Sequence, residues 1–276
     1  MKTRVLTAVV MVAVMIPFFV FSETVAFPIL TGFLGLVGAY EMQGCLGKRR
    51  FWAASVPPIL VCAGMPFLVR YGAAESQFGF VFLISFSLVV YLFIVSVFSG
   101  KKLPVTEAAL SGATGVYVAF GFASLVLLRD LPHGLWIVLL AFLIPWMTDT
   151  FAYFSGRLFG KHKLIPEVSP KKTVEGSVGG TLCAVLLTLL YAFLVGLLTD
   201  ASPRYLPLAV VALVVSLLSQ CGDLIMSLIK RHYGIKDYGT LFPGHGGVLD
   251  RFDSIVCTAP FLYFLSATVP GFALFL

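Results

Sequence analysis

The sequence predicts an all-α, polytopic integral membrane protein with about nine transmembrane helices and a cytoplasmic N-terminus. Three observations support this prediction. Hydrophobic residues make up 59% of the 276 residues and charged residues only 12%, with a mean hydropathy of +0.99, whereas soluble domains are about 25% charged. Segments of about 20 apolar residues recur, as membrane-spanning helices require. The Lys and Arg residues gather in alternate connections, which indicates the cytoplasmic side.

Nine segments meet the length criterion, and polar or proline-containing connections separate them. They lie near residues 5–21, 25–42, 52–70, 78–99, 107–128, 134–155, 177–198, 206–229 and 249–274. The second and third contain Pro28, Pro57 and Pro58, which membrane helices tolerate. The first follows Lys2 and Arg4 as a signal peptide would, but no small-residue cleavage site comes after it. We therefore expect a retained first helix.

The charge distribution predicts the orientation of these helices. Of the 19 Lys and Arg residues, only Arg70, Arg129 and Arg204 fall on the predicted outer side. The sixteen on the cytoplasmic side are Lys2, Arg4, Lys48, Arg49, Arg50, Lys101, Lys102, Arg157, Lys161, Lys163, Lys171, Lys172, Lys230, Arg231, Lys236 and Arg251. The net charge of +6 thus reflects topology and does not indicate a nucleic-acid partner. We expect the protein in the inner (cytoplasmic) membrane.

The chain is predicted to form a single membrane domain over residues 1–276. Residues 1–130 supply N-terminal helices, and residues 131–276 supply the catalytic helices and cytosolic loops. The two long polar connections, 156–176 and 230–248, face the cytoplasm in this topology.

Acidic residues lie within or beside these apolar segments, where an ionisable group is costly and marks a functional site by default. They are Asp149, Asp223, Asp250 and Asp253. A second possibility for each is a helix-end acid that meets lipid headgroups. Asp149 shares a predicted helix face with Tyr153 and Arg157, at i+4 and i+8.

One polar stripe runs along the segment near 206–229. Ser216, Gln220, Asp223, Ser227 and Lys230 follow one another at spacings of 4, 3, 4 and 3, which places them on one helix face. Such a stripe lines either a water-accessible cleft or a partner helix.

The surrounding residues suit a hard cation and phosphate groups. Carboxylates on separate helices, without a His or Cys cluster, favour magnesium, which takes a few carboxylates, water and substrate phosphate oxygens. Lys171 and Lys172 lie in SPKKTVEG, and PGHGG at 243–247 precedes a predicted helix N-terminus, an arrangement that suits anions. Taken singly, the basic residues could serve only to set the topology or to bind anionic headgroups, and PGHGG could be an ordinary turn. His245 is open between a general acid, a phosphate ligand and a turn residue.

The segment 227–253 resembles the signature of the phosphatidate cytidylyltransferase family, also called CDP-diacylglycerol synthases. The matching residues are Ser227, Ile229, Lys230, Arg231, Ile235, Lys236, Asp237, Pro243 to Gly247, Val248, Asp250, Arg251, Phe252 and Asp253. A second similar stretch covers 149–180, with FGKHKL, SPKKTVEG and Gly179–Gly180.

This resemblance implies a membrane enzyme, homodimeric and dependent on a divalent metal, that makes CDP-diacylglycerol and pyrophosphate from CTP and phosphatidic acid. It implies one or two Mg²⁺ ions with Asp223 and Asp250 as principal ligands. We expect Asp223, Asp250, Lys236 and Asp149 to be catalytic. The expected substrate-binding residues are Lys172, Ser227, Lys230, Arg231, Asp237, His245, Gly246, Arg251 and Asp253.

Two other classes of function are compatible with a membrane protein of this composition. A polyprenol kinase, or a cytidylyltransferase for another lipid phosphate, would also use CTP at a membrane, but the complete signature disfavours a kinase. A transporter or channel would place acids near mid-bilayer and repeat broken helices in both halves. Here the acids crowd one side and one half of the chain.

Overall fold

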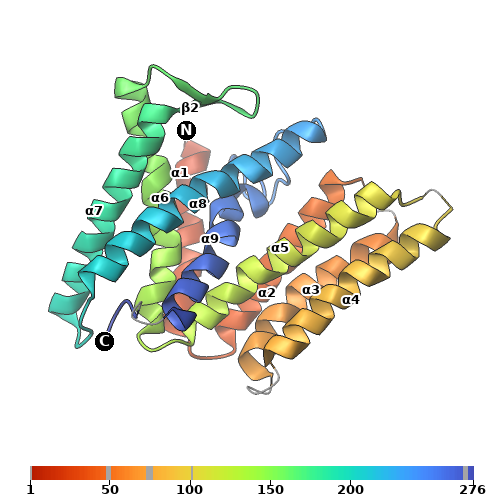
Figure 1. Cartoon of the computed structure of the whole chain (residues 1–276), viewed down its shortest axis with the longest axis horizontal. Helices are drawn as coiled ribbons and strands as arrows, with labels where there is room; N and C mark the ends of the chain where they lie inside the picture. Colours follow the sequence, from red (N-terminus) through yellow and green to blue (C-terminus); the bar gives the residue numbers. More distant parts are fainter. Residues whose placement is uncertain (1, 48–50, 73–76, 101, 270–272) are drawn as a thin grey trace. The chain divides into compact units, whose positions relative to one another are not determined.

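The computed structural model describes residues 2–47, 51–72, 77–100, 102–269 and 273–276. Of the predicted cytoplasmic cations, Lys48, Arg49, Arg50 and Lys101 lie outside these ranges. The described residues form nine α-helices and one short hairpin, coloured along the chain in Figure 1. They divide into two compact units, which we call unit 1 and unit 2.

Unit 1 comprises residues 1–127 and 232–252. Its helices are α1 (Lys2–Val20), α2 (Ala26–Cys45), α3 (Trp52–Tyr71), α4 (Gln77–Phe98) and most of α5 (Val105–Arg129). Helix α2 packs closely on α3 because glycines face the α3 backbone. A Cβ on Gly32 would lie 2.7 Å from the Ala63 carbonyl oxygen, and one on Gly35 2.6 Å from that of Cys62. Small residues at such an interface are the usual means of close helix approach in membranes.

Unit 2 comprises residues 128–231 and 253–276. It contains α6 (Gly134–Phe159), strands β1 (Lys163–Ile165) and β2 (Ser169–Thr173), α7 (Val174–Leu198), α8 (Tyr205–His232, except its last residue) and most of α9 (Leu249–Thr268). Helices α6 and α7 pack along their length. Gly180 permits this contact, because a Cβ there would lie 2.5 Å from the Thr148 carbonyl oxygen.

Six of the helices in the described residues are long and apolar enough to cross a membrane, and the protein is a multi-pass membrane protein. They are α3, α4, α5, α6, α7 and α8. Helices α1, α2 and α9, which the sequence also predicts as spans, are not among them. Polar residues lower the hydropathy of α2 and α9: the former contains Glu41 and Gln43, and the latter Asp250, Arg251 and Asp253.

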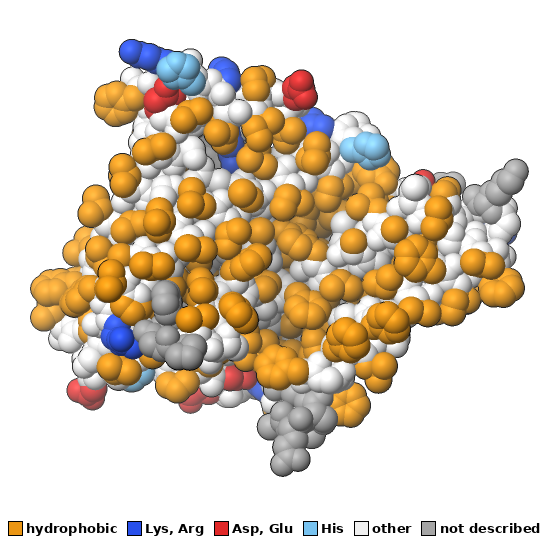
Figure 2. Space-filling view, in the orientation of Figure 1, with side chains coloured by type: hydrophobic (Ala, Val, Ile, Leu, Met, Phe, Trp, Pro, Cys, Tyr) orange, Lys and Arg blue, Asp and Glu red, His pale blue; other side chains and the backbone are white. Residues whose placement is uncertain are grey.

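The outer surfaces of α4 and α7 are hydrophobic and exposed. Phe82 and Phe98 of α4 and Leu182, Leu186 and Leu197 of α7 are all more than half exposed. Most of the face drawn in Figure 2 is likewise hydrophobic. A soluble monomer does not present so much contiguous apolar surface, so these faces are suited to contact lipid tails.

Within the described residues, the hairpin departs from the predicted all-α architecture. It lies in the connection 156–176, which was predicted as a polar loop. Strands β1 and β2 pair antiparallel, with Lys163 opposite Thr173 and Ile165 opposite Ser169. Pro166 follows β1 and cannot continue the ladder as a donor, so the chain turns there and its backbone groups pair with one another.

Candidate active site

Unit 2 gathers acidic residues from three helices. Asp223 lies on α8, Asp253 near the start of α9 and Asp149 on α6. The carboxylate of Asp253 is close enough to those of Asp223 and Asp149 to interact electrostatically with both. Helices α8 and α9 approach closely at Gly222, where a Cβ would lie 2.6 Å from the Cβ of Cys257. The glycine beside Asp223 therefore brings the two acid-bearing helices together.

Cations hold this acidic cluster together. The ammonium nitrogen of Lys172 lies 2.5 Å from Oδ2 of Asp223, and both side chains are about three-quarters buried. Ser227, one turn further along α8, donates a hydrogen bond of 3.4 Å to Oδ1 of Asp223. Lys230 is buried and interacts electrostatically with Asp253. The positive charges of Lys172 and Lys230 offset part of the electrostatic repulsion between the neighbouring carboxylates.

The carboxylates of unit 2 fit a magnesium site that substrate helps to complete. In the part of the chain that the structure describes, no group of three or more His, Cys, Asp or Glu side chains converges as a ready-made metal site. Magnesium does not need one, because it binds through one or two carboxylates and takes its other ligands from water and phosphate oxygens. Asp223 and Asp253 supply the hard oxygen donors that this mode requires.

A cavity of about 330 Å³ lies beside these acids, between α6, β2 and the first turn of α7. Three cationic side chains, Arg157, Lys171 and Lys172, line it together with Asp149. Tyr153 also lines it and lies 3.5 Å from Arg157, from hydroxyl to guanidinium, so the predicted face of α6 is confirmed. We call this the α7 cavity.

The N-terminus of α7 contributes to the α7 cavity. Thr173 caps the helix, since its hydroxyl accepts a hydrogen bond of 3.1 Å from the backbone N–H of Gly176. Gly176 and Ser177 line the cavity. The first turn of a helix carries unpaired N–H groups and a partial positive charge, so it favours anions such as phosphate. The α7 cavity thus combines three cationic side chains with a helix N-terminus.

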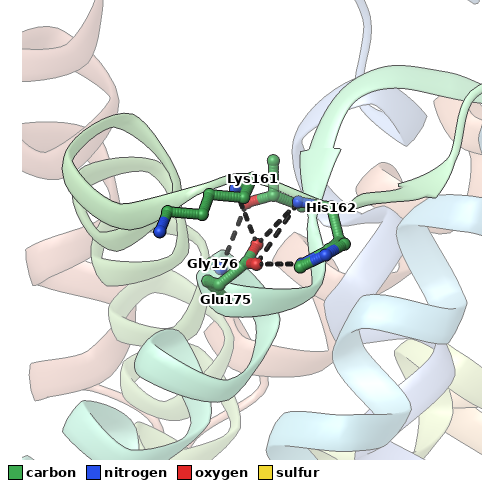
Figure 3. A network of polar contacts seen from close by, with 5 residues as sticks. Lys161, His162, Glu175 and Gly176 are labelled. Carbon is green, nitrogen blue, oxygen red and sulfur yellow. Dashed lines mark hydrogen bonds and ion pairs between the residues drawn. The ribbon is translucent and has the colours of Figure 1, made fainter.

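A network around Glu175 fixes the entry to the hairpin (Figure 3). Its carboxylate accepts hydrogen bonds from the backbone N–H groups of Lys161 and His162. It also lies 2.6 Å from Nδ1 of the His162 ring. These contacts tie the end of α6 to the first turn of α7 and so position β2, which carries Lys171 and Lys172. No role is predicted for His162 from the sequence, and the structure shows it to be a structural partner of Glu175.

The inner half of the predicted α8 stripe has a packing role. Ser216 donates a hydrogen bond of 3.0 Å to Thr181 of α7 and accepts one of 2.8 Å from Thr148 of α6. Gln220 donates another of 3.0 Å to Thr181. All four side chains are buried. The stripe thus joins a partner-helix contact at Ser216 and Gln220 to the acidic cluster at Asp223.

In unit 1 the PGHGG segment forms a tight turn. Phe242 and Gly246 pair through a backbone hydrogen bond of 2.9 Å, and the N–H of His245 donates to the Phe242 carbonyl at 2.8 Å. Gly244 and Gly246 have φ angles of 78° and 87°, in the left-handed region that other residues rarely adopt. Nδ1 of His245 is buried and has no hydrogen-bond partner among the described residues, so a ligand could supply one.

Asp250 holds this turn from the first turn of α9. Its Oδ2 accepts hydrogen bonds from the backbone N–H groups of Tyr238, at 2.8 Å, and Gly247, at 2.9 Å. Asp250 is buried. Both bonds end on the same carboxylate oxygen and so fix the orientation of the Asp250 side chain. The two predicted metal ligands belong to different units: Asp223 lies in unit 2 and Asp250 in unit 1.

Glu41 is a site residue that is not predicted from the sequence. It lies on α2, is 3% exposed, and accepts hydrogen bonds from the backbone N–H groups of Val248 (2.9 Å) and Leu249 (3.0 Å). It therefore caps α9 from a position 207 residues away in sequence. A Cβ on Gly247 would collide with its carboxylate. The signal was present, because Glu41 is an acid inside a predicted membrane span.

The turn encloses a second cavity, of about 480 Å³, which we call the loop cavity. Lys236, Asp237, His245, Gly246 and Arg251 line it. All five are residues that the sequence predicts to bind substrate or act in catalysis. Two cations, a backbone turn and an unpaired imidazole nitrogen make it a second anion-binding position. Arg231, also predicted, is an exposed residue near the end of α8.

Comparison with known proteins identifies the family. Residues 2–269 match the sequence profile of the Cytidylyltransferase family. This chain belongs to the cytidylyltransferase family. It is 35% identical to the phosphatidate cytidylyltransferase of Staphylococcus haemolyticus and 36% identical to that of Staphylococcus saprophyticus. Each match covers 270 residues, 96% of this chain and 98% of the relative. The enzyme of Staphylococcus aureus is 35% identical over 268 residues, with the same coverage.

The predicted site residues of this cytidylyltransferase fall into two sets. Unit 2 assembles Asp149, Lys172, Asp223, Ser227, Lys230 and Asp253 around the acidic cluster and the α7 cavity. Unit 1 assembles Lys236, Asp237, His245, Gly246, Asp250 and Arg251 around the loop cavity. Each set contains both acids and phosphate-type cations, as a reaction between two phosphate compounds requires.

Proposed function

We propose that this protein transfers the cytidylyl group of CTP to phosphatidic acid and forms CDP-diacylglycerol and pyrophosphate. The observation that carries the proposal is the similarity to phosphatidate cytidylyltransferases over 96% of the chain. The complete signature in residues 227–253 supports it, as do the two cation-lined cavities. A membrane protein with apolar outer faces also has direct access to a two-chain lipid substrate in the bilayer.

The reaction needs no serine or cysteine nucleophile. Phosphatidate carries a phosphate monoester whose second pKa is about 6, so the group is largely dianionic near neutral pH. One of its oxygens attacks the α-phosphorus of CTP. A new P–O bond forms as the bond from the α-phosphorus to the bridging oxygen of the β-phosphate breaks, and pyrophosphate leaves with that electron pair. The two reactants repel each other, so the protein must position and neutralise them.

The cationic residues of both cavities do this work. In unit 2, Lys172, Arg157 and the N-terminus of α7 bind phosphate oxygens. In unit 1, Lys236, Arg251 and the turn around His245 do the same. The ion pair between Lys172 and Asp223 keeps the ammonium group at the wall of the α7 cavity before substrate arrives. Such preorganised charge stabilises the charge that develops on the leaving pyrophosphate.

We propose magnesium as the cofactor, as one or two ions. Asp223 and Asp250 are the principal ligands in this proposal, with Asp149 and Asp253 as further contributors of carboxylate oxygens. When bound, the ion would neutralise phosphate charge and polarise the phosphorus that is attacked. The acidic cluster around Asp223 supports this assignment, since its oxygen donors match the preference of magnesium.

For the membrane arrangement, we propose nine spans, with α1, α2 and the apolar part of α9 added to the six described above. The N-terminus and both cavities then face the cytoplasm, where CTP is available, and the protein lies in the inner membrane as a homodimer. A cysteine placed at Glu167, on the exposed hairpin turn, in a variant whose five native cysteines are replaced by serine, should react with an impermeant thiol reagent only from the cytoplasmic side. Light scattering of the detergent complex should give the mass of two chains.

The reaction is tested with purified, detergent-solubilised protein, CTP, magnesium and phosphatidic acid. Pyrophosphate release and a CDP-lipid identified by mass should appear together, and EDTA should stop both. Asp223→Ala should lower turnover by about a hundredfold or more. Glu167→Ala, which removes an exposed acid from the hairpin, should leave it unchanged. Free CDP with a newly phosphorylated lipid alcohol, or wild-type rates for Asp223→Ala, would contradict the proposal.

A further inference from the structure

Unit 1 contains an apolar groove of about 390 Å³ between α1, α2 and the PGHGG turn. The groove is lined mainly by Val10, Val14, Leu30, Phe33, Leu241 and Phe242. Almost all of its wall is hydrocarbon, and its volume falls within the range of ligand-binding pockets. No residue in its apolar wall has a role in the reaction described so far.

The apolar groove and the loop cavity share part of one wall. Phe242 and Pro243 line both of them. Helix α1 is fastened to this wall, because the hydroxyl of Thr7 donates a hydrogen bond of 3.0 Å to the Pro243 carbonyl. On the far side of the wall, Lys236 and Arg251 line the loop cavity. Unit 1 thus presents a cationic cavity and a hydrocarbon groove next to each other.

The groove is open along its length. Val10, Val14 and Phe33 are each about half exposed, at 51%, 54% and 53%. Val10 and Val14 lie on α1 and Phe33 on α2, and other hydrophobic residues of these helices, such as Val20, Ile29 and Leu36, are also exposed. A hydrocarbon chain can therefore enter sideways from the bilayer and pass into the groove without crossing water, which keeps its apolar surface out of contact with solvent throughout.

We propose that the apolar groove binds an acyl chain of the phosphatidate substrate while its phosphate occupies the loop cavity. This inference rests on the proposed function, since it assigns the lipid substrate to unit 1. Among amphiphiles, a chain attached to a phosphate monoester matches both halves: Lys236 and Arg251 attract the dianionic head, and the groove takes the tail. A zwitterionic bilayer lipid would match only the groove.

Trp substitution at Val14 tests the proposal against a matched control at Ile16. Both residues lie on α1 and are 54% exposed, but only Val14 lines the groove. Val14→Trp should raise the KM for dioleoyl phosphatidate about tenfold, the loss expected when roughly two methylene groups lose their apolar contact. The KM values for dihexanoyl phosphatidate and for CTP should not change, which also shows that the variant is folded. Ile16→Trp should leave all three values unchanged.

A binding measurement separates this inference from the proposed function. With the native Trp52, Trp136 and Trp146 replaced by Phe, the fluorescence of Val14→Trp should be quenched by brominated-chain phosphatidate in unbrominated phosphatidylcholine. The quenching should be saturable and stronger than that of Ile16→Trp in the same background. Brominated phosphatidylcholine should quench both variants alike. If Val14→Trp is quenched more strongly than Ile16→Trp but the wild-type protein forms no CDP-lipid, the proposed function is overturned and the groove assignment stands. Equal quenching, or equal KM changes for long and short chains, would overturn the groove assignment; Val10→Trp, on the same wall, repeats the test independently.

Discussion

Replacing Glu41 by glutamine should weaken the hydrogen bonds that anchor the end of the PGHGG turn, while the side chain keeps its size. The carboxylate of Glu41 accepts one hydrogen bond from Val248 N–H and one from Leu249 N–H. An amide keeps one acceptor oxygen, so one of these buried N–H groups loses its partner, at about 1–3 kcal/mol. The lost negative charge at the N-terminus of α9 adds about 0.3–1 kcal/mol. If half of this energy positions the turn, kcat/KM falls about threefold to thirtyfold, since about 1.4 kcal/mol is one factor of ten.

The assay is steady-state pyrophosphate release with CTP and phosphatidate, alongside thermal unfolding in the same detergent. Gln43→Leu is the control, because Gln43 lies two residues along α2, is equally buried, and hydrogen-bonds to Ser111 instead of the turn. It should lower the unfolding temperature and leave kcat/KM nearly unchanged. Glu41→Ala, which removes both acceptors, should exceed Glu41→Gln in both measurements. The reasoning is refuted if Glu41→Gln retains the wild-type kcat/KM. It is also refuted if Gln43→Leu, at the same unfolding temperature as Glu41→Gln, shows an equal fall in kcat/KM.

Two further substitutions test the two units separately. Lys172→Met removes the ammonium group 2.5 Å from Asp223 and should reduce kcat about a hundredfold, the usual effect of losing one preorganised charge donor; a kcat within threefold of wild type would exclude Lys172 from the reaction. Gly247→Ala places a methyl group against the Glu41 carboxylate and should lower the apparent Tm. Gly64→Ala, where no atom lies within 4 Å of the added carbon, should leave Tm unchanged or raise it. Equal Tm values for the two glycine variants would show that Glu41 does not constrain the turn.

The sequence predicted the helices well because the membrane imposes a strong pattern. An unpaired backbone group is so costly in lipid that a long apolar segment has to be a helix, and all nine predicted segments contain one. It also predicted that Asp223 and Ser227 share a face, and a hydrogen bond joins them. It did not reveal that Ser216 and Gln220, on the same face, are occupied by Thr181 of another helix. Helical periodicity gives the face of a residue but not what packs against that face.

The contact between Glu41 and the turn could not be predicted from the sequence pattern for a related reason. A carboxylate inside a predicted span could be marked as functional from its cost alone, but the partner lies more than 200 residues away. The hairpin β1–β2 was missed because its strands have three and five residues, too short for an alternating pattern. It forms because the chain must return from α6 to α7 and pair its own backbone groups.

The signature in residues 227–253 separates in the structure into residues that shape the turn and residues that remain available to ligand. The shaping residues are Gly246, in the left-handed region, Gly247, whose lack of a side chain admits the Glu41 carboxylate, and Asp250, whose oxygen accepts two backbone hydrogen bonds. Because glycines and a carboxylate shape the turn, the cationic side chains of Lys236 and Arg251 are not needed for this purpose and line the loop cavity. Loss of a shaping residue should therefore move both cations together and affect kcat and KM jointly. Loss of one cation should chiefly weaken binding of the phosphate that it contacts.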